Sequence, residues 1–264
     1  PESGRCLSEL QEANVDVTPV WVLPGVQLGT CIVLVGPDAS PVYVTHLADG
    51  LLWSHEALSD TVGRAASLYL SVYELLNEGA LNPVLAAAQE HHNRGGVLLI
   101  DLCPAVGWPE LIPGAERLLS LATLVTGTAD EFAALGRHLG LSPAAVVESL
   151  LAQGAVQVHV KRGAGGAEVF TGQGHWVQPT RQAQVIDSTG AGDAYAAAVL
   201  AAYLFGATPA QALELGVWCG TRACIRLGGD SFRGLSAAVG AHPSFSWLKA
   251  SSVDGGVGRV GRTP

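Results

Sequence analysis

From residue 65 onward, short apolar runs alternate with longer segments that carry apolar residues at helical spacing. The runs lie at 66–70, 97–100, 121–125 and 156–160. Runs that stay apolar, rather than alternating with polar residues, are typical of parallel strands covered by helices on both faces. The pattern therefore predicts an α/β fold with three layers, α/β/α, around a mostly parallel sheet.

The segments between these runs carry helix start and stop signals. Asn82 with Pro83 opens one predicted helix, which Gly95 ends, and Ser142 with Pro143 opens another, which Gly154 ends. Further helices are predicted over 129–139, 194–205 and 209–227.

Polar residues follow the ends of several predicted strands. Asp101, Thr128 and Lys161 come at or just after apolar runs, and Asp187 follows a predicted short strand at Val185–Ile186. Ligands of open α/β sheets bind at the carboxyl ends of the strands. We therefore expect these side chains at the functional site.

A glycine-rich turn, Asp-Ser-Thr-Gly-Ala-Gly-Asp at 187–193, leads into the helix predicted for 194–205. Glycines let backbone N–H groups converge on one point, and the free N–H groups and dipole of a helix start favour an anion. A carboxylate at the mouth of such a site can take a proton from a hydroxyl that attacks phosphorus. This predicts Asp193 as a general base and Gly190, Ala191 and Gly192 as an anion hole.

This run, with a strand before it and a helix of small residues after it, resembles the signature of the ribokinase-like (PfkB) carbohydrate kinases. The resemblance implies a ribokinase-like sandwich with a small β lid, and ATP-dependent phosphorylation of a hydroxyl of a sugar or sugar acid. Adenosine-type nucleoside kinases share the Gly-Ala-Gly-Asp turn, so nucleoside phosphorylation is an alternative.

A second glycine-rich segment, 161–167, follows a predicted strand and resembles the family's other nucleotide loop. A simple hairpin turn is the alternative. Asp187 is expected either to cap its turn or to help place a monovalent cation, and Gly228 belongs to a closing turn similar to the family's. The nucleotide contacts that the resemblance implies are Lys161, Gly163, Gly166, Asp187, Thr189 and Gly228.

The segment 126–131 stands where the family has an Asn-x-x-Glu motif that organises Mg²⁺ and phosphate, largely through water. The resemblance implies Mg²⁺ support by Glu131 and Thr128, although Thr128 replaces Asn; a threonine helix cap is compatible with this role. Cys103 likewise replaces the Asn of a D-x-N motif that begins at Asp101. These replacements make a catalytically impaired nucleotide-binding relative a third hypothesis.

We expect one kinase domain over 1–250, with a lid hairpin at about 28–47 around the turn-forming loop 36–41, and a flexible tail over 251–264. Nothing in 1–13 matches the family's opening strands, so we expect an N-terminally incomplete member. Lids of this family often pair between subunits, which makes a homodimer plausible.

The amino-acid composition limits the classes of binding partner and the cellular compartment that we expect. Of 264 residues, 48% are hydrophobic and 14% charged, and the net charge is −9, which argues against nucleic acid or an anionic membrane as partner. The longest apolar run, 194–205, is too short to span a bilayer. Five cysteines without a C-x-x-C pair favour a cytoplasmic protein over a disulfide framework.

Overall fold

The computed structural model describes residues 2–36, 41–46, 55–76, 79–103, 109–181, 183–228 and 234–248. Its strands are β1 (Thr30–Val35), β2 (Pro41–His46), β3 (Ser67–Ser71), β4 (Val97–Asp101), β5 (Leu124–Thr128), β6 (Gln157–Lys161), β7 (Ala167–Thr171) and β8 (Gly174–Gln178). Its α-helices are α1 (Glu2–Glu12), α2 (His55–Val62), α3 (Leu81–Asn93), α4 (Ile112–Leu119), α5 (Ala129–Leu139), α6 (Pro143–Ala152), α7 (Ala191–Leu204), α8 (Pro209–Ala223) and α9 (Leu235–Ala241).

The main sheet has the strand order β3-β4-β5-β6-β7-β8. The first four strands are parallel, and β7 and β8 continue the sheet as antiparallel strands. The predicted mostly parallel sheet is therefore confirmed. Its register sets Asp101 beside Thr126, and Thr128 beside Lys161, so the polar ends of β4, β5 and β6 lie at one edge.

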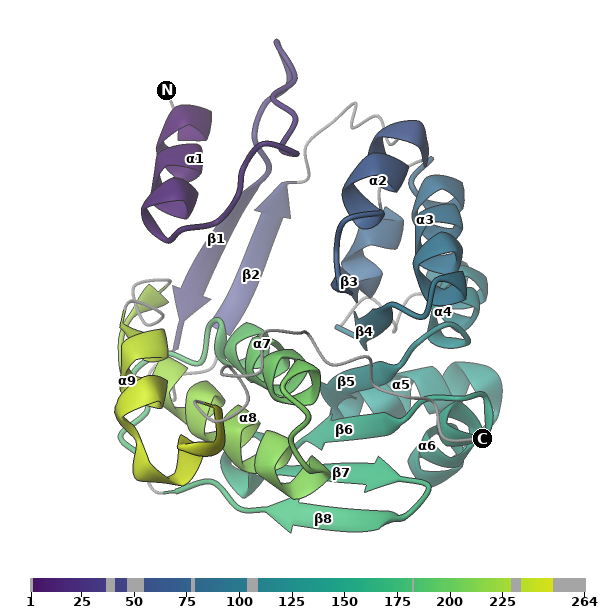
Figure 1. The fold of residues 1–264 in the computed structure, drawn as a ribbon, viewed down its shortest axis with the longest axis vertical. Coiled ribbons are helices and arrows are strands. Elements are labelled where there is room, and N and C mark those ends of the chain that lie inside the picture. The colour runs from purple at the N-terminus through teal and green to yellow at the C-terminus, as the bar shows by residue number, and fades with distance from the viewer. Residues whose placement is uncertain are drawn as a thin grey trace.

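Alternate strand residues face two separate cores. Residues such as Ile100 and Val158 pack with α3, α4, α5 and α6, whereas Leu99 and Val169 pack with α7 and α8 (Figure 1). This confirms the three-layer sandwich. Helices α7 and α8 approach closely because α8 carries Gly216, where an added Cβ would lie 2.8 Å from the Tyr195 ring.

Strands β1 and β2 form a separate antiparallel hairpin beside α1, away from the main sheet (Figure 1). Ile32 pairs with Val44 and Leu34 with Val42, which places four apolar side chains on one face of the hairpin. All four are 55–60% exposed. The hairpin is the one expected from the sequence; residues 37–40 of its turn lie outside the described part of the chain.

Some boundaries differ from the sequence prediction. Val185 and Ile186 form no strand: both are about half exposed, and the Ile186 N–H donates to the Cys224 carbonyl at the end of α8. Helix α3 begins at Leu81 with Ala80 as its N-cap, so Asn82 is not the cap. Helix α7 begins three residues earlier than expected, α8 ends at Ala223, and α9 follows it. Gly229 and the expected tail 251–264 lie outside the described residues.

Within the described ranges, no helix combines the length and apolar character needed to cross a membrane.

Candidate active site

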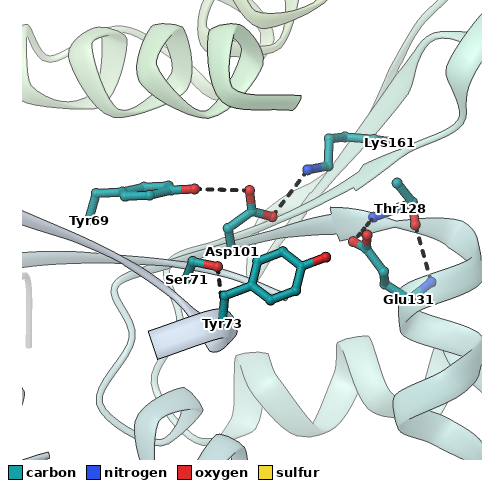
Figure 2. Close-up of polar contacts among 7 residues, drawn as sticks. All are labelled: Tyr69, Ser71, Tyr73, Asp101, Thr128, Glu131 and Lys161. Atoms are coloured by element: carbon teal, nitrogen blue, oxygen red, sulfur yellow. Dashed lines mark hydrogen bonds and ion pairs between the residues drawn. The ribbon is translucent and has the colours of Figure 1, made fainter. Parts of the chain in front are cut away.

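The site is built at the carboxyl edge of the parallel strands, around a buried ion pair. Lys161, at the end of β6, donates to Asp101 at the end of β4 over 3.1 Å, and both side chains are largely buried. The Tyr69 hydroxyl of β3 donates to the other Asp101 oxygen over 3.3 Å (Figure 2). Three strands thus contribute to one polar cluster, as the strand-end pattern predicts for Asp101 and Lys161.

Lys161 also connects this cluster to the start of α7. A Cβ added to Gly192 would lie 3.4 Å from the Lys161 ammonium nitrogen, so the cation is next to the first turn of the helix. Gly190 caps α7 in the left-handed conformation, with φ of 81°, which glycine adopts without strain. The glycine turn and the lysine therefore meet at one place.

Asp193 lies in that first helical turn and its side chain is exposed. Partial desolvation and the nearby Asp101 carboxylate raise the pKa of Asp193, while Lys161 opposes the rise. The three charged groups therefore act on one another. Asp193 is a carboxylate beside a helix start, with a cation close by.

Thr128 and Glu131 form a reciprocal cap at the start of α5. The Thr128 N–H donates to a Glu131 carboxylate oxygen over 2.7 Å, and the Glu131 N–H donates to the Thr128 hydroxyl over 3.2 Å. Burial raises the pKa of Glu131, against the effect of the Thr128 N–H and of Lys161. In the described ranges no three His, Cys, Asp or Glu side chains are grouped to hold a metal by themselves.

Asp187, Thr189 and Gly228 form a second cluster. The carboxylate of Asp187 accepts the Thr189 N–H and the Gly228 N–H, each over 2.9 Å. Burial alone would raise the pKa of Asp187, but the hydrogen bonds from Thr189 and Gly228 hold it below its usual range. The predicted capping role of Asp187 is confirmed, and the Thr189 hydroxyl oxygen is buried without a partner among the described residues.

The segment 162–166 joins β6 to β7 as a tight turn, which confirms the hairpin alternative for its backbone. The Arg162 N–H donates to the Gly166 carbonyl over 2.8 Å, and Gly163 and Gly166 both have positive φ. A Cβ on Gly166 would lie 2.0 Å from the Gln178 carbonyl oxygen. Gly166 is therefore required where the turn crosses the end of β8.

A hollow lies between α8 and the chain that follows β8. Its volume is about 230 Å³, and its lining includes Gln178, Pro179, Glu214, Val217, Trp218 and Thr221. Arg222 lies over the Trp218 ring, 5.7 Å from its centroid.

Two tyrosines at the site are not identified from the sequence. Tyr69 holds Asp101, and the Tyr73 hydroxyl points toward Glu131 (Figure 2). Burial raises the pKa of Tyr73 to about 12, and Cys103, Glu131 and groups of the hairpin contribute to the rise. The sequence feature that could have identified them is their position at the end of an apolar run, but aromatic residues in such a run are usually assigned to the hydrophobic core.

Cys103, two residues after Asp101, is buried and has a positive φ of 49°. This conformation is uncommon for a residue with a Cβ. The predicted D-x-N position is thus a tight turn next to the site; Pro104, which follows it, lies outside the described residues.

Sequence comparison identifies kinases. A family model described as pfkB family carbohydrate kinase matches residues 2–232. An ATP-dependent ribose-1-phosphate kinase of Halopiger xanaduensis is 40% identical over 74 residues, 28% of this chain and 25% of that protein. A 2-dehydro-3-deoxygluconokinase of Thermoproteus tenax is 29% identical over 228 residues, 82% of this chain and 68% of that protein. The alignments thus span a quarter and about two thirds of these relatives.

Solved structures share the fold. A putative ribokinase II from E. coli in complex with ATP and Mg²⁺ has a TM-score of 0.78 at 21% identity, covering 92% of this chain and 78% of that one. An adenosine kinase from Anopheles gambiae has a TM-score of 0.74 at 21% identity, covering 89% and 73%. With the family match over most of its length, the chain belongs to the pfkB family of carbohydrate kinases.

Proposed function

We propose that this protein transfers the γ-phosphoryl group of ATP to a hydroxyl of a sugar or sugar acid. The observation that carries the proposal is the position of Lys161, which is bonded to Asp101 over 3.1 Å and lies against Gly192 at the start of α7. It joins the polar cluster at the strand ends to a helix start suited to phosphate. Phosphoryl transfer needs an acceptor and a phosphate to be held in line at one point.

Asp193 is the general base in this proposal. The acceptor oxygen forms its bond to the γ-phosphorus, the bond from that phosphorus to the β,γ-bridging oxygen breaks, and ADP leaves. The acceptor proton passes to the Asp193 carboxylate. A pKa raised above the usual aspartate range makes this carboxylate a better proton acceptor than an ordinary one.

The phosphoryl group is held by backbone N–H groups of the turn. The Ala191 N–H already donates to the Ser188 carbonyl over 3.2 Å. The hole is therefore assigned mainly to Gly190, Gly192 and Asp193, with Lys161 as the adjacent cation. Dipoles fixed before the reaction stabilise the developing charge without reorganisation.

Mg²⁺ fits the oxygen-rich side chains at the end of β5. One Glu131 oxygen and the Thr128 hydroxyl are occupied in the helix cap, so these residues can contribute the remaining carboxylate oxygen and contacts through water. Mg²⁺ commonly keeps several waters and binds one or two carboxylates together with substrate phosphates. When bound, the ion would neutralise phosphate charge.

The rest of ATP is assigned to the second cluster and the neighbouring hollow. The buried, unpartnered Thr189 hydroxyl offers a hydrogen bond beside the glycine turn, and Asp187 fixes Gly228 next to it. We assign Lys161, Gly163 and Gly166 as further contacts along one side of the ATP. The hollow near Val217 and Trp218 is mainly apolar and suits a nucleobase. A monovalent cation near Asp187 stays a prediction. Both carboxylate oxygens of Asp187 already accept backbone N–H groups.

A nucleoside acceptor is the second candidate. It is supported by the exposed rings of Tyr69 and Tyr73 at the acceptor side of the site, which offer flat surfaces for a base or a sugar. A nucleotide-binding protein with impaired catalysis is the third, and it rests on Thr128 and Cys103 at positions where the family has Asn.

We further infer a homodimer through the hairpin. A two-stranded sheet is marginally stable alone, and Ile32, Leu34, Val42 and Val44 present an apolar face to solvent in the single chain. A second copy offers the same face and would cover it.

The decisive experiment measures ADP release from Mg·ATP with a panel of ribose, fructose, 2-keto-3-deoxygluconate and adenosine, for the wild type and for Asp193→Asn. We expect acceptor-dependent release by the wild type. The variant should lose about 10²- to 10⁴-fold in kcat and bind ATP normally by calorimetry, because only the proton acceptor is removed. Equal turnover by the variant would exclude Asp193 as the base, and ATP binding without turnover by the wild type would favour the third candidate.

A further inference from the structure

A fully buried hydrogen-bonded network lies beneath the first turns of α7. The Tyr195 hydroxyl of α7 is 2.9 Å from Nδ1 of His159, and Nε2 of His159 is 2.9 Å from the Gln157 side-chain oxygen. Their side chains are at most 4% exposed. None of the three is used by the proposed mechanism.

The direction of these hydrogen bonds follows from the charge of His159. Burial, with a further contribution from Lys161, lowers the pKa of His159 to about 3, so the imidazole is neutral at physiological pH. A neutral imidazole has one donor and one acceptor. With the Gln157 oxygen at Nε2, that nitrogen carries the proton, and the Tyr195 hydroxyl donates to Nδ1. Each hydrogen-bonding capacity of the imidazole is used.

The network connects two groups of the active site along short paths. Residues 157, 159 and 161 lie on one face of β6, the face covered by α7. On this face the His159 side chain is next to that of Lys161, on the side away from the strand end. Tyr195 lies two residues after Asp193 on α7. One edge of the Tyr195 ring lies against α8 at Gly216. Tyr195 therefore contacts β6 through its hydroxyl and α8 through its ring.

An apolar contact alone would hold α7 less well. The α7 residues around Tyr195 are mainly alanine, whose short side chains interdigitate less deeply with the sheet than larger side chains would. A hydrogen bond is directional and weakens steeply when its angle changes. Burying three polar side chains is costly unless they are paired, so their presence in this core favours a specific geometric role over simple packing.

We propose that Gln157, His159 and Tyr195 are positioning residues that fix α7 on β6, and so fix Asp193 relative to Lys161 and the acceptor. This inference rests on the proposed kinase function for its kinetic test. A shift of about 1 Å in reacting groups can cost about 10²-fold in rate. The network would act on turnover, through Asp193, more than on substrate affinity.

The test is Tyr195→Phe, which removes one hydroxyl and keeps the ring. We expect kcat to fall about 10- to 100-fold while the KM for MgATP stays within about 2-fold. The matched control is Val199→Ala, a fully buried residue one turn further along α7 in the same core. It should lower Tm and leave kcat within about 2-fold. Equal kcat losses in the two variants would overturn the proposal.

A triple variant separates positioning from stability. Gln157→Leu, His159→Leu and Tyr195→Phe together leave none of the network's polar groups unpaired, so Tm should recover relative to Tyr195→Phe alone. Because directional bonds are still missing, kcat should remain low. Recovery of kcat together with Tm would show that the network only stabilises the fold.

Hydrogen exchange gives a readout that does not depend on the reaction. In Tyr195→Phe, amides 190–195 should exchange faster than in the wild type by more than the change in global stability explains, and Val199→Ala should not show this local increase. Unchanged local exchange would overturn the positioning role. If the wild type shows no kinase activity but exchange responds as expected, the proposed function fails and the positioning of α7 stands.

Discussion

Asp101 is the residue on which the charges of the site depend. It holds Lys161 and Tyr69 through its two oxygens, and its negative charge raises the pKa of Asp193. Burial and then the Asp101 charge raise the pKa of the Tyr69 hydroxyl, so Tyr69 stays protonated and remains a donor. One carboxylate thus holds a cation and a hydroxyl donor in place and contributes to the raised pKa of the proposed base.

This role predicts a shift in the pH profile. Asp193 acts as a carboxylate, so kcat/KM should fall as pH decreases through its raised pKa, which lies above the usual value of about 4. Asp101→Asn removes a like charge and leaves the Lys161 cation less neutralised, and both changes lower the pKa of Asp193. The acidic limb of kcat/KM should therefore move to lower pH.

The control for this measurement is Tyr69→Phe, which removes a hydrogen bond and keeps the Asp101 charge. Its acidic limb should stay near that of the wild type. A limb that stays in place or moves to higher pH in Asp101→Asn would mean that another group titrates.

The sequence identifies site residues that stand at the ends of predicted strands better than residues whose place at the site depends on the tertiary structure. Lys161 and Asp101 could be assigned to the site because both end parallel strands, and such ends share an edge. Tyr69 and Tyr73 could not, because an aromatic residue in an apolar run is usually part of the core. Their exposure at the site depends on which strand lies at the sheet edge.

At the scale of elements, the turn between β6 and β7 contains two glycines with positive φ that differ in the space around them. Gly166 has a φ of 91°, and a Cβ there would meet the Gln178 carbonyl at 2.0 Å, whereas Gly163 has a φ of 53° and open space around it. Gly166→Ala should therefore lower the free energy of unfolding by about 2–5 kcal/mol, from conformational strain and overlap together.

Gly163→Ala is the matched control, with strain alone, and should cost about 1–2 kcal/mol. Urea denaturation of both variants measures the difference. Equal losses would show that the backbone of β8 moves aside and that the close approach is not a constraint.

Elements with strong local signals were predicted well, and those set by tertiary contacts were not. Helix α5 was predicted with its observed bounds, since Thr128 and Glu131 form a complete local cap. Val185 and Ile186 look like a strand but carry half-exposed side chains, and the Ile186 N–H donates to the end of α8 instead of to a sheet. Hydrophobicity alone cannot distinguish these two partners.

At the scale of the whole molecule, the site is assembled by topology. Strands β3, β4 and β6 and helix α7 come from segments far apart in the sequence, and the parallel arrangement brings their polar ends together at one edge (Figure 1). The hairpin β1–β2 is linked to this edge electrostatically, because Tyr43 and Cys31 contribute to the raised pKa of Tyr73. The hairpin face that carries Cys31 and Tyr43 therefore lies within electrostatic range of Tyr73.

The opposite hairpin face supports the last prediction. Ile32 and Val44 are directly paired there, each 55% exposed, and the proposed homodimer would bury both. The double variant Ile32→Asp with Val44→Asp places charges in the contact, where unpaired charges are costly. Sedimentation should then change from dimer to monomer. Val177→Asp, at a 59% exposed valine of β8, should leave the dimer intact. A wild type that sediments as a monomer at micromolar concentration would refute the interface, and a dimer that tolerates both charges would place the contact elsewhere.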